Sequence, residues 1–180
     1  MADRVRFLAA AALLGSLTAC APMYGPPPPG RMTTPPPGGD TAFRAGDFAW
    51  SQAPGRNTLA GALGHAGPVR YTCAGATVVL TPETPWARRR MQVLYKSDQR
   101  AALPVDDVRS RQHQAPPGDS NPYVKRATCN AADHFSFSNL PDGAWYLVTI
   151  AKPARGSTGP TLAIMRRVTT HGGRVTAFEM

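Results

Sequence analysis

Acidic residues, aromatic residues and histidine are all scarce in this sequence. Its 180 residues include 11 Asp and Glu against 20 Lys and Arg, four His, and only 8% Phe, Trp and Tyr. The histidines, at positions 65, 113, 134 and 171, lack the close spacing that lets two imidazoles bind one metal ion. Neither Cys-x-x-Cys nor Gly-x-Ser-x-Gly occurs. We therefore expect no metal site, no cofactor and no hydrolase nucleophile.

A long hydrophobic run is also absent from the start of the chain. The apolar stretch at 7–17 has about 11 residues, whereas a membrane-spanning helix needs ~20. It follows a basic start and precedes small residues, which is the pattern of an export signal. We interpret residues 1–19 as a signal peptide.

The signal ends in Leu-Thr-Ala-Cys, which resembles the bacterial lipobox. The resemblance implies a cut before Cys20 and a diacylglyceryl group on its thiol, with an acyl group on the new amino terminus. Several acyl chains give anchoring that does not readily reverse. Ala21 stands where an Asp commonly retains lipoproteins at the inner membrane, so we expect the outer membrane, facing the periplasm. An ordinary signal peptide cut after Ala19 is the alternative.

Proline and glycine are abundant, with 19 and 17 residues, which disfavours a helical bundle. Much of the proline is concentrated at Pro22, Pro26 to Pro29 and Pro35 to Pro37. Such a segment favours extended polyproline II, at about 3.1 Å per residue, and predicts a semi-rigid spacer. A ligand for a proline-binding groove is the alternative. We assign 20–43 to the lipidated cysteine and linker, and 44–180 to one domain.

The formal net charge is +9, and 17 of the 20 cations are Arg. Removal of residues 1–19 leaves 18 cations and 10 anions, so the basicity belongs to the mature chain. A tethered basic domain is attracted to anionic lipid, lipopolysaccharide or peptidoglycan. Arginines that only support solubility are the alternative. Nucleic acid is disfavoured as a partner, because an exported protein rarely meets it.

Cys73 and Cys129 remain as an even pair once Cys20 carries lipid. In an oxidising compartment such a pair predicts a disulfide. It would close a loop of 56 residues, with a chain-entropy stabilisation of about 4 kcal/mol. Two free thiols or a metal site are the alternatives.

Short segments with β-strand patterns, separated by turn residues, account for most of the domain. We expect about seven strands, at 57–63, 69–73, 76–81, 134–140, 145–151, 162–169 and 174–178. Phe135 and Phe137 alternate with serines, as in a half-buried strand, whereas 145–151 is apolar on both faces and predicts a central strand. The expected fold is an all-β, antiparallel, immunoglobulin-like or prealbumin-like sandwich.

One segment predicts a short inserted helix at 85–95. Thr84 is a capping residue, Pro85 takes the first helical position, and apolar residues recur at helical spacing. The other side of this helix is basic. A stretch without sustained periodicity follows at 97–122, which we interpret as a long loop.

Arginine and aromatic residues are enriched at recognition surfaces. The candidate binding surface is therefore the helix and its neighbourhood, with Trp86, Arg88, Arg89, Arg90, Tyr95 and Arg100. The alternative for Trp86 is that it packs the helix onto the sandwich.

The strands carry a pattern known from one family. It comprises Cys73-Ala-Gly-Ala-Thr-Val-Val-Leu-Thr-Pro82, Cys129-Asn-Ala-Ala-Asp-His-Phe-Ser-Phe137 and Asn139-Leu-Pro-Asp-Gly-Ala-Trp-Tyr146. This resembles the carboxypeptidase regulatory-like group of prealbumin-like (transthyretin-like) β-sandwiches, over about residues 57–180. His134 stands where the family usually has Gly, so the turn before it is expected to differ. Family members are mostly accessory, binding or structural modules, so the resemblance implies a fold and no chemistry.

We expect a non-enzymatic, envelope-anchored lipoprotein whose sandwich binds a partner protein or an anionic envelope surface. An alternative is a carbohydrate-binding or peptidoglycan-binding module, with Trp50, Tyr123, Trp145 and Tyr146 as available aromatics. A periplasmic hydrolase is the third reading. Its triad would need Asp133, His134 and Ser136, but neighbouring residues on a strand point to opposite faces.

Overall fold

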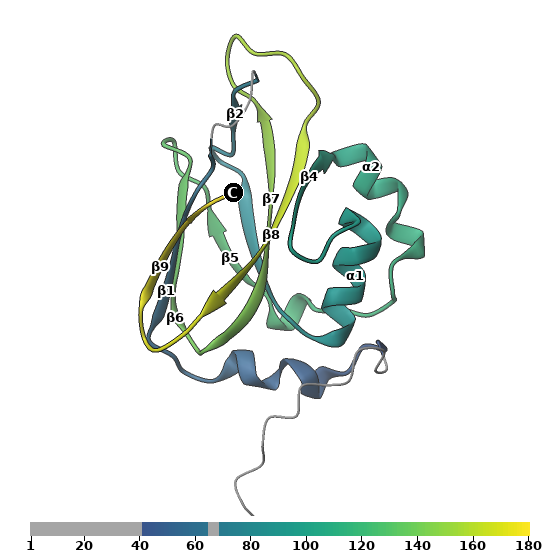
Figure 1. Cartoon of the computed structure of the whole chain (residues 1–180), viewed down its shortest axis with the longest axis vertical. Helices are drawn as coiled ribbons and strands as arrows, with labels where there is room; N and C mark the ends of the chain where they lie inside the picture. The colour runs from purple at the N-terminus through teal and green to yellow at the C-terminus, as the bar shows by residue number, and fades with distance from the viewer. Residues whose placement is uncertain (1–40, 65–68) are drawn as a thin grey trace, which may run out of the picture. The chain divides into compact units, whose positions relative to one another are not determined.

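Two β-sheets and a layer of helices make up the described part of the chain (Figure 1). The structure, a computed structural model, describes residues 41–64 and 69–180. The predicted signal peptide, Cys20 and nearly all of the predicted linker lie outside these residues. No helix within them has the length and apolar character needed to cross a membrane.

The strands are β1 (Asn57–Ala62), β2 (Tyr71–Thr72), β3 (Thr77–Pro82), β4 (Arg100–Pro104), β5 (Lys125–Thr128), β6 (His134–Leu140), β7 (Gly143–Pro153), β8 (Leu162–Thr170) and β9 (Val175–Glu179). The helices are α1 (Pro85–Tyr95) and α2 (Val105–Ser110), with 3-10 helices η1 (Ala45–Gln52), η2 (Gln112–Gln114) and η3 (Asn121–Tyr123).

The sheets differ in size. The small sheet has the order β6-β1-β9, and the large sheet has the order β4-β8-β7-β3-β5, with β2 paired to β7. Every pairing is antiparallel except β1 with β9, which is parallel. The predicted all-β sandwich is confirmed, with nine strands in the described residues instead of about seven.

A first hydrophobic core fills the space between the two sheets. The small sheet contributes Leu59, Phe135, Phe137 and Leu140, and the large sheet contributes Val78, Leu80, Trp145, Leu147, Ala151, Ile164 and Val168. Their alternation along each strand follows the period of two that places successive side chains on opposite faces.

A second core lies on the other face of the large sheet, under α1, α2 and η1. Its buried residues are Phe48, Trp86, Ala87, Met91, Leu94, Tyr95, Val108, Tyr146, Ala163 and Met165. Figure 1 shows α1 and α2 beside the large sheet, on the side away from β1, β6 and β9. The described part of the chain therefore has three layers.

Strand β7 contributes to both cores. Trp145 and Leu147 face the small sheet, whereas Tyr146 faces the helices, and all three are fully buried. The indole Nε1 of Trp145 donates a hydrogen bond to Thr170 Oγ1 at 3.0 Å, so its polar atom is satisfied. The prediction of a central strand that is apolar on both faces is confirmed.

Helix α1 has the predicted bounds. Thr84 Oγ1 accepts a hydrogen bond from the Ala87 amide at 3.0 Å, and Pro85 occupies the first helical position. The helix ends at Lys96, whose φ of 57° is left-handed.

The prediction of one long loop at 97–122 is wrong. This stretch contains β4, α2 and two 3-10 helices. Strand β4 lies at an edge of the large sheet and is only 5 residues long, and α2 has 6 residues, so neither is long enough to show a hydrophobic period. Strand β5, with the sequence Lys-Arg-Ala-Thr, forms the opposite edge of the sheet. The sequence did not predict it, because a short, polar edge strand has no run of buried apolar residues.

The folded domain includes the residues just before β1. Phe48 in η1 is fully buried, and the ring of Trp50 packs on Trp145 with centroids 4.8 Å apart. Phe43, the last residue of the predicted linker, contacts Phe48 and Trp86 with ring centroids 5.3 and 5.2 Å apart. A Cβ at Gly143 would lie 2.2 Å from the Trp50 ring, so η1 packs closely against the start of β7.

The turn before β6 contains a residue in the left-handed conformation. Asp133 has a φ of 61°, a conformation that Asp tolerates better than most residues. Asn130 Oδ1 accepts hydrogen bonds from the amides of Ala132 and His134, each at 2.9 Å. The turn therefore has its left-handed residue at Asp133, and His134 begins the strand.

A buried amide connects three separate segments of the domain. Asn57 is 1% exposed, and its Nδ2 donates to Leu140 O at 2.9 Å and to Asp142 Oδ1 at 2.8 Å. Its Oδ1 accepts from the Arg174 amide at 3.1 Å. The start of β1, the β6–β7 turn and the β8–β9 hairpin are thus held by one side chain.

Replacement of the Asn57 side chain should destabilise the fold. Asn57→Ala is expected to lower the free energy of unfolding by about 2–3 kcal/mol, because Leu140 O and the Arg174 amide lose a partner where water reaches poorly. Urea unfolding followed by circular dichroism measures it. The control is Ser138→Ala on exposed β6 surface; an equal loss in both variants would contradict the assigned role.

Candidate functional site

The structure places most of the predicted binding surface inside the protein or in internal contacts. Trp86 is 1% exposed and Tyr95 is 6% exposed, so neither can contact a partner. Trp86 Nε1 donates to Pro117 O at 2.8 Å. This corrects the assignment of Trp86 and Tyr95 to a recognition surface, because both pack α1 onto the large sheet.

Two of the three consecutive arginines have partners within the protein. Arg88 forms an ion pair with Glu83, and Arg90 Nη1 donates to Pro116 O at 3.2 Å. The Arg90 guanidinium also lies over the Trp86 ring, 5.5 Å from its centroid. Arg89 is exposed, and no acidic side chain in the described residues pairs with it.

The carboxylate of Glu83 is almost completely buried between two arginines. Its side chain is 7% exposed, and Oε2 lies 2.7 Å from Arg167 Nη2 on β8 while Oε1 contacts Arg88. The hydrogen bond from Arg88 to Glu83 raises the pKa of Arg88. This cluster joins the start of α1 to the large sheet. Burial first, and then the negative charge of Glu83, raise the pKa of Tyr146, whereas Arg88 opposes the shift.

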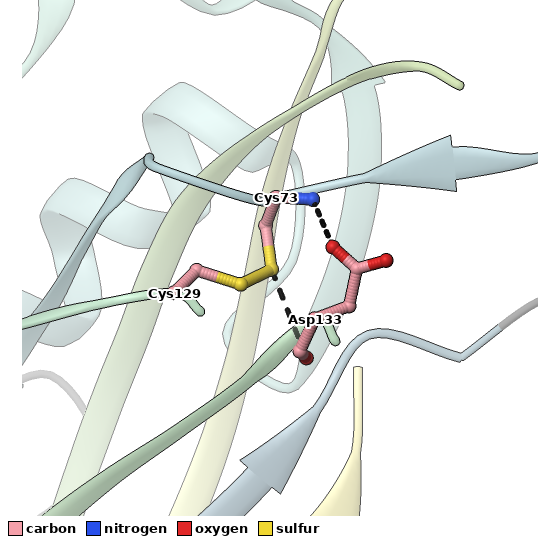
Figure 2. A group of neighbouring side chains, drawn as sticks. All are labelled: Cys73, Cys129 and Asp133. Carbon is pink, nitrogen blue, oxygen red and sulfur yellow. Dashed lines mark hydrogen bonds between the residues drawn. A yellow bond between two sulfur atoms is a disulfide. The ribbon is translucent and has the colours of Figure 1, made fainter. Parts of the chain in front are cut away.

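Cys73 and Cys129 form the predicted disulfide, with Cα atoms 5.7 Å apart. Figure 2 shows Asp133 beside this disulfide. The possible ligand atoms of Cys73, Cys129 and Asp133 lie within 4.8 Å of one another, close enough for a metal site. The two sulfurs are bonded to each other, however, and so the group is explained without a metal.

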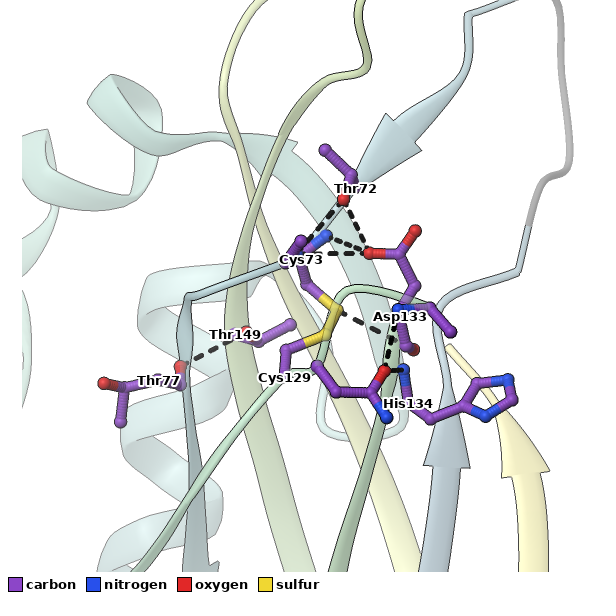
Figure 3. Close-up of a disulfide and its surroundings, with 10 residues drawn as sticks. Thr72, Cys73, Thr77, Cys129, Asp133, His134 and Thr149 are labelled. Atoms are coloured by element: carbon purple, nitrogen blue, oxygen red, sulfur yellow. Dashed lines mark hydrogen bonds between the residues drawn. A yellow bond between two sulfur atoms is a disulfide. The ribbon is translucent and has the colours of Figure 1, made fainter.

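The Asp133 carboxylate has a structural role in the same place. Its Oδ1 accepts hydrogen bonds from Thr72 Oγ1 and the Cys73 amide, each at 2.7 Å, and from the Ala74 amide at 3.2 Å (Figure 3). It therefore holds the segment after β2 against the turn before β6. Figure 3 shows His134 pointing away from it, so these residues do not form a relay.

The aromatic residues considered for sugar binding are not free platforms. Trp145 and Tyr146 are fully buried, and Trp50 packs on Trp145. Tyr123 stacks on Phe48 with ring centroids 4.8 Å apart. Each of these rings already packs against the protein, so a ligand would need other contacts.

The outer face of the small sheet is hollowed. A shallow depression of about 850 Å³ lies over β6, β1 and β9. Two rows of residues cross the sheet there, Ser136–Ala60–Ala177 and His134–Ala62–Glu179. The alanines and Ser136 form the floor, and His134 and Glu179 lie at its border. The remaining lining residues are Gly61, Ala127, Thr128, Asn130, Phe135 and Phe178.

The chemistry of this hollow is a small-residue floor with a polar border. The alanines leave room above the backbone, whereas His134, Glu179 and Asn130 offer hydrogen-bond donors and acceptors. Sequence reasoning missed it, although Leu59 and Gly61 on one face of β1 already place Ala60 and Ala62 on the other. The hollow exists only where β6, β1 and β9 lie side by side, and these strands are far apart in the sequence.

The burial of Tyr95 makes a prediction about alkaline stability. Burial raises the pKa of Tyr95 to about 12, against about 10 in an unfolded chain. The fold favours the neutral phenol, so its contribution is complete below pH 10 and is lost as the pH rises towards 12. The expected loss is roughly 2–3 kcal/mol. Tyr95→Phe should flatten the decline in unfolding free energy between pH 9.5 and about 11.5; an unchanged slope would disprove this origin.

The chain is similar in fold to the crystal structure of a "putative carbohydrate binding protein" from Pseudomonas aeruginosa. The TM-score is 0.55 and the sequence identity 19%, over 77% of this chain and 97% of that chain. No protein-family model and no curated protein matches the chain. At this level of identity, the likeness concerns the fold of the β-sandwich.

Proposed function

We propose that this protein is a non-enzymatic, envelope-tethered module that binds a glycan in the hollow of the small sheet. The observation that carries the proposal is the depression of about 850 Å³, whose floor is alanine and serine and whose border is polar. Ligand pockets commonly have volumes of about 300–1,000 Å³ and a few placed polar groups.

The arrangement suits an extended, hydroxyl-rich ligand. Ala60 and Ala177 allow a sugar ring to approach the sheet, and Glu179 and His134 border the neighbouring row. A carboxylate accepts hydrogen bonds from hydroxyl groups, and an imidazole can both donate and accept them. The solved structure with a similar fold carries a carbohydrate-binding description, which supports the same class of ligand.

An anionic envelope surface is a second candidate ligand. It is favoured by the excess of 18 cations over 10 anions that remains after removal of residues 1–19, and by the exposure of Arg89 and Arg100. The burial of Trp86 and Tyr95 removes the aromatic part of that surface. The hollow therefore supports the glycan proposal better.

The tether in this proposal is the lipid on Cys20, followed by the proline-rich spacer to residue 43. A polyproline II segment of this length extends over some tens of ångströms. The module would thus reach from the outer membrane into the periplasm, towards peptidoglycan, or bind a partner protein there. The proposal assigns no catalytic residue.

The tether is tested by Cys20→Ser in the full chain. The wild type should label with radioactive fatty acid, whereas the variant should be unlabelled, because serine offers no thiol for the lipid. Fatty-acid labelling that persists in Cys20→Ser would rule out this anchor.

The glycan site is tested by filling the hollow. In the Cys20→Ser chain, Ala177→Trp should reduce co-sedimentation with isolated peptidoglycan sacculi at least about tenfold, since the indole occupies the floor. Ala102→Trp, at an exposed position of β4 outside the hollow, is the matched control. Failure of the wild type to bind sacculi or any soluble polysaccharide, or equal binding by Ala177→Trp, would refute the proposal.

A further inference from the structure

Two arginines stand directly opposite each other on neighbouring strands of the large sheet. Arg100 on β4 pairs in register with Arg166 on β8. Directly opposite residues have Cβ atoms about 4.5–5.5 Å apart and side chains on the same face. Like charges in such positions destabilise a sheet. The fold therefore maintains an unfavourable arrangement at this place.

Other arginines of the same region have acidic partners. Arg167, next along β8, points to the opposite face and pairs with Glu83 at 2.7 Å. Within residues 41–64 and 69–180, no acidic side chain forms an ion pair with Arg100 or Arg166. Asp98 is close in sequence, but its carboxylate contacts the amides of Gln92 and Gln99, at 3.5 and 3.4 Å.

The surroundings of the pair favour an anion. The Arg166 guanidinium lies 5.8 Å from the centroid of the Phe178 ring on β9, and the ring partly shields it from water. Arg166 is half-buried and Arg100 is exposed, so one donor group is partly shielded and the other is accessible. Partial exclusion of water strengthens a charge-assisted hydrogen bond.

We propose that Arg100 and Arg166 bind a phosphate group. Two guanidinium groups together offer ten N–H donors, and a phosphate dianion supplies both negative charges and several acceptor oxygens. A single carboxylate would neutralise only one of the two cations. The phosphate can be free or carried on an envelope lipid. Phe178 lines the hollow and also lies against Arg166, but neither arginine lines the hollow, so the site does not depend on the glycan proposal.

The test measures binding of inorganic phosphate to the Cys20→Ser chain by calorimetry, with chloride at the same ionic strength as reference. Arg166→Gln and Arg100→Gln should each weaken phosphate binding at least about tenfold, because each removes one guanidinium group and its positive charge. Arg155→Gln, an exposed arginine between β7 and β8, is the matched control and should bind as the wild type. Phosphate should also raise the melting temperature of the wild type and leave that of both pair variants unchanged.

Vesicles distinguish the two sources of phosphate. Tighter binding to phosphatidylcholine vesicles that contain phosphatidic acid than to inorganic phosphate, lost in the pair variants, assigns a lipid-borne group. Equal affinity for both assigns free phosphate. Absence of phosphate binding, or equal weakening by Arg155→Gln, overturns the site. Ala177→Trp should bind phosphate normally, so failure of the glycan proposal would be recognised separately.

Discussion

The structure depends on the need to bury both faces of β7. Its alternating side chains are apolar in both directions, with Trp145 on one side and Tyr146 on the other. A single covering sheet would leave the Tyr146 face in water. The small sheet covers the first face, and α1, α2 and η1 cover the second. The helical segment between β3 and β5 is therefore a required layer of the core.

This requirement also decides which recognition residues are free. Trp86 and Tyr95 contribute the large rings that complete the second core, and Arg88 and Arg90 hold the adjoining segments. Most of the side chains that α1 offered for recognition are therefore used in contacts within the protein. What remains open is the outer face of the small sheet, whose residues are too small to attract notice in the sequence.

Local signals explain what the sequence could predict. Thr84 and Pro85 define the start of α1, the Phe135 alternation defines β6, and the two cysteines pair as expected. Edge strands β4 and β5 were not predicted, because each is short and has one exposed face, so its sequence shows no hydrophobic periodicity. The hollow and the opposed arginines depend on register between distant strands, and a single sequence does not contain that information.

The parallel pairing of β1 with β9 has a consequence for how the chain becomes folded. The first strand of the described residues lies between β6 and β9, which are made much later, and β9 is the last of the described strands. A ribosome or an export channel that releases the N-terminus first delivers β1 long before its neighbours. The small sheet, and with it the hollow, can close only after the final strand emerges. Until then the inner face of β1 is uncovered and exposed to aggregation.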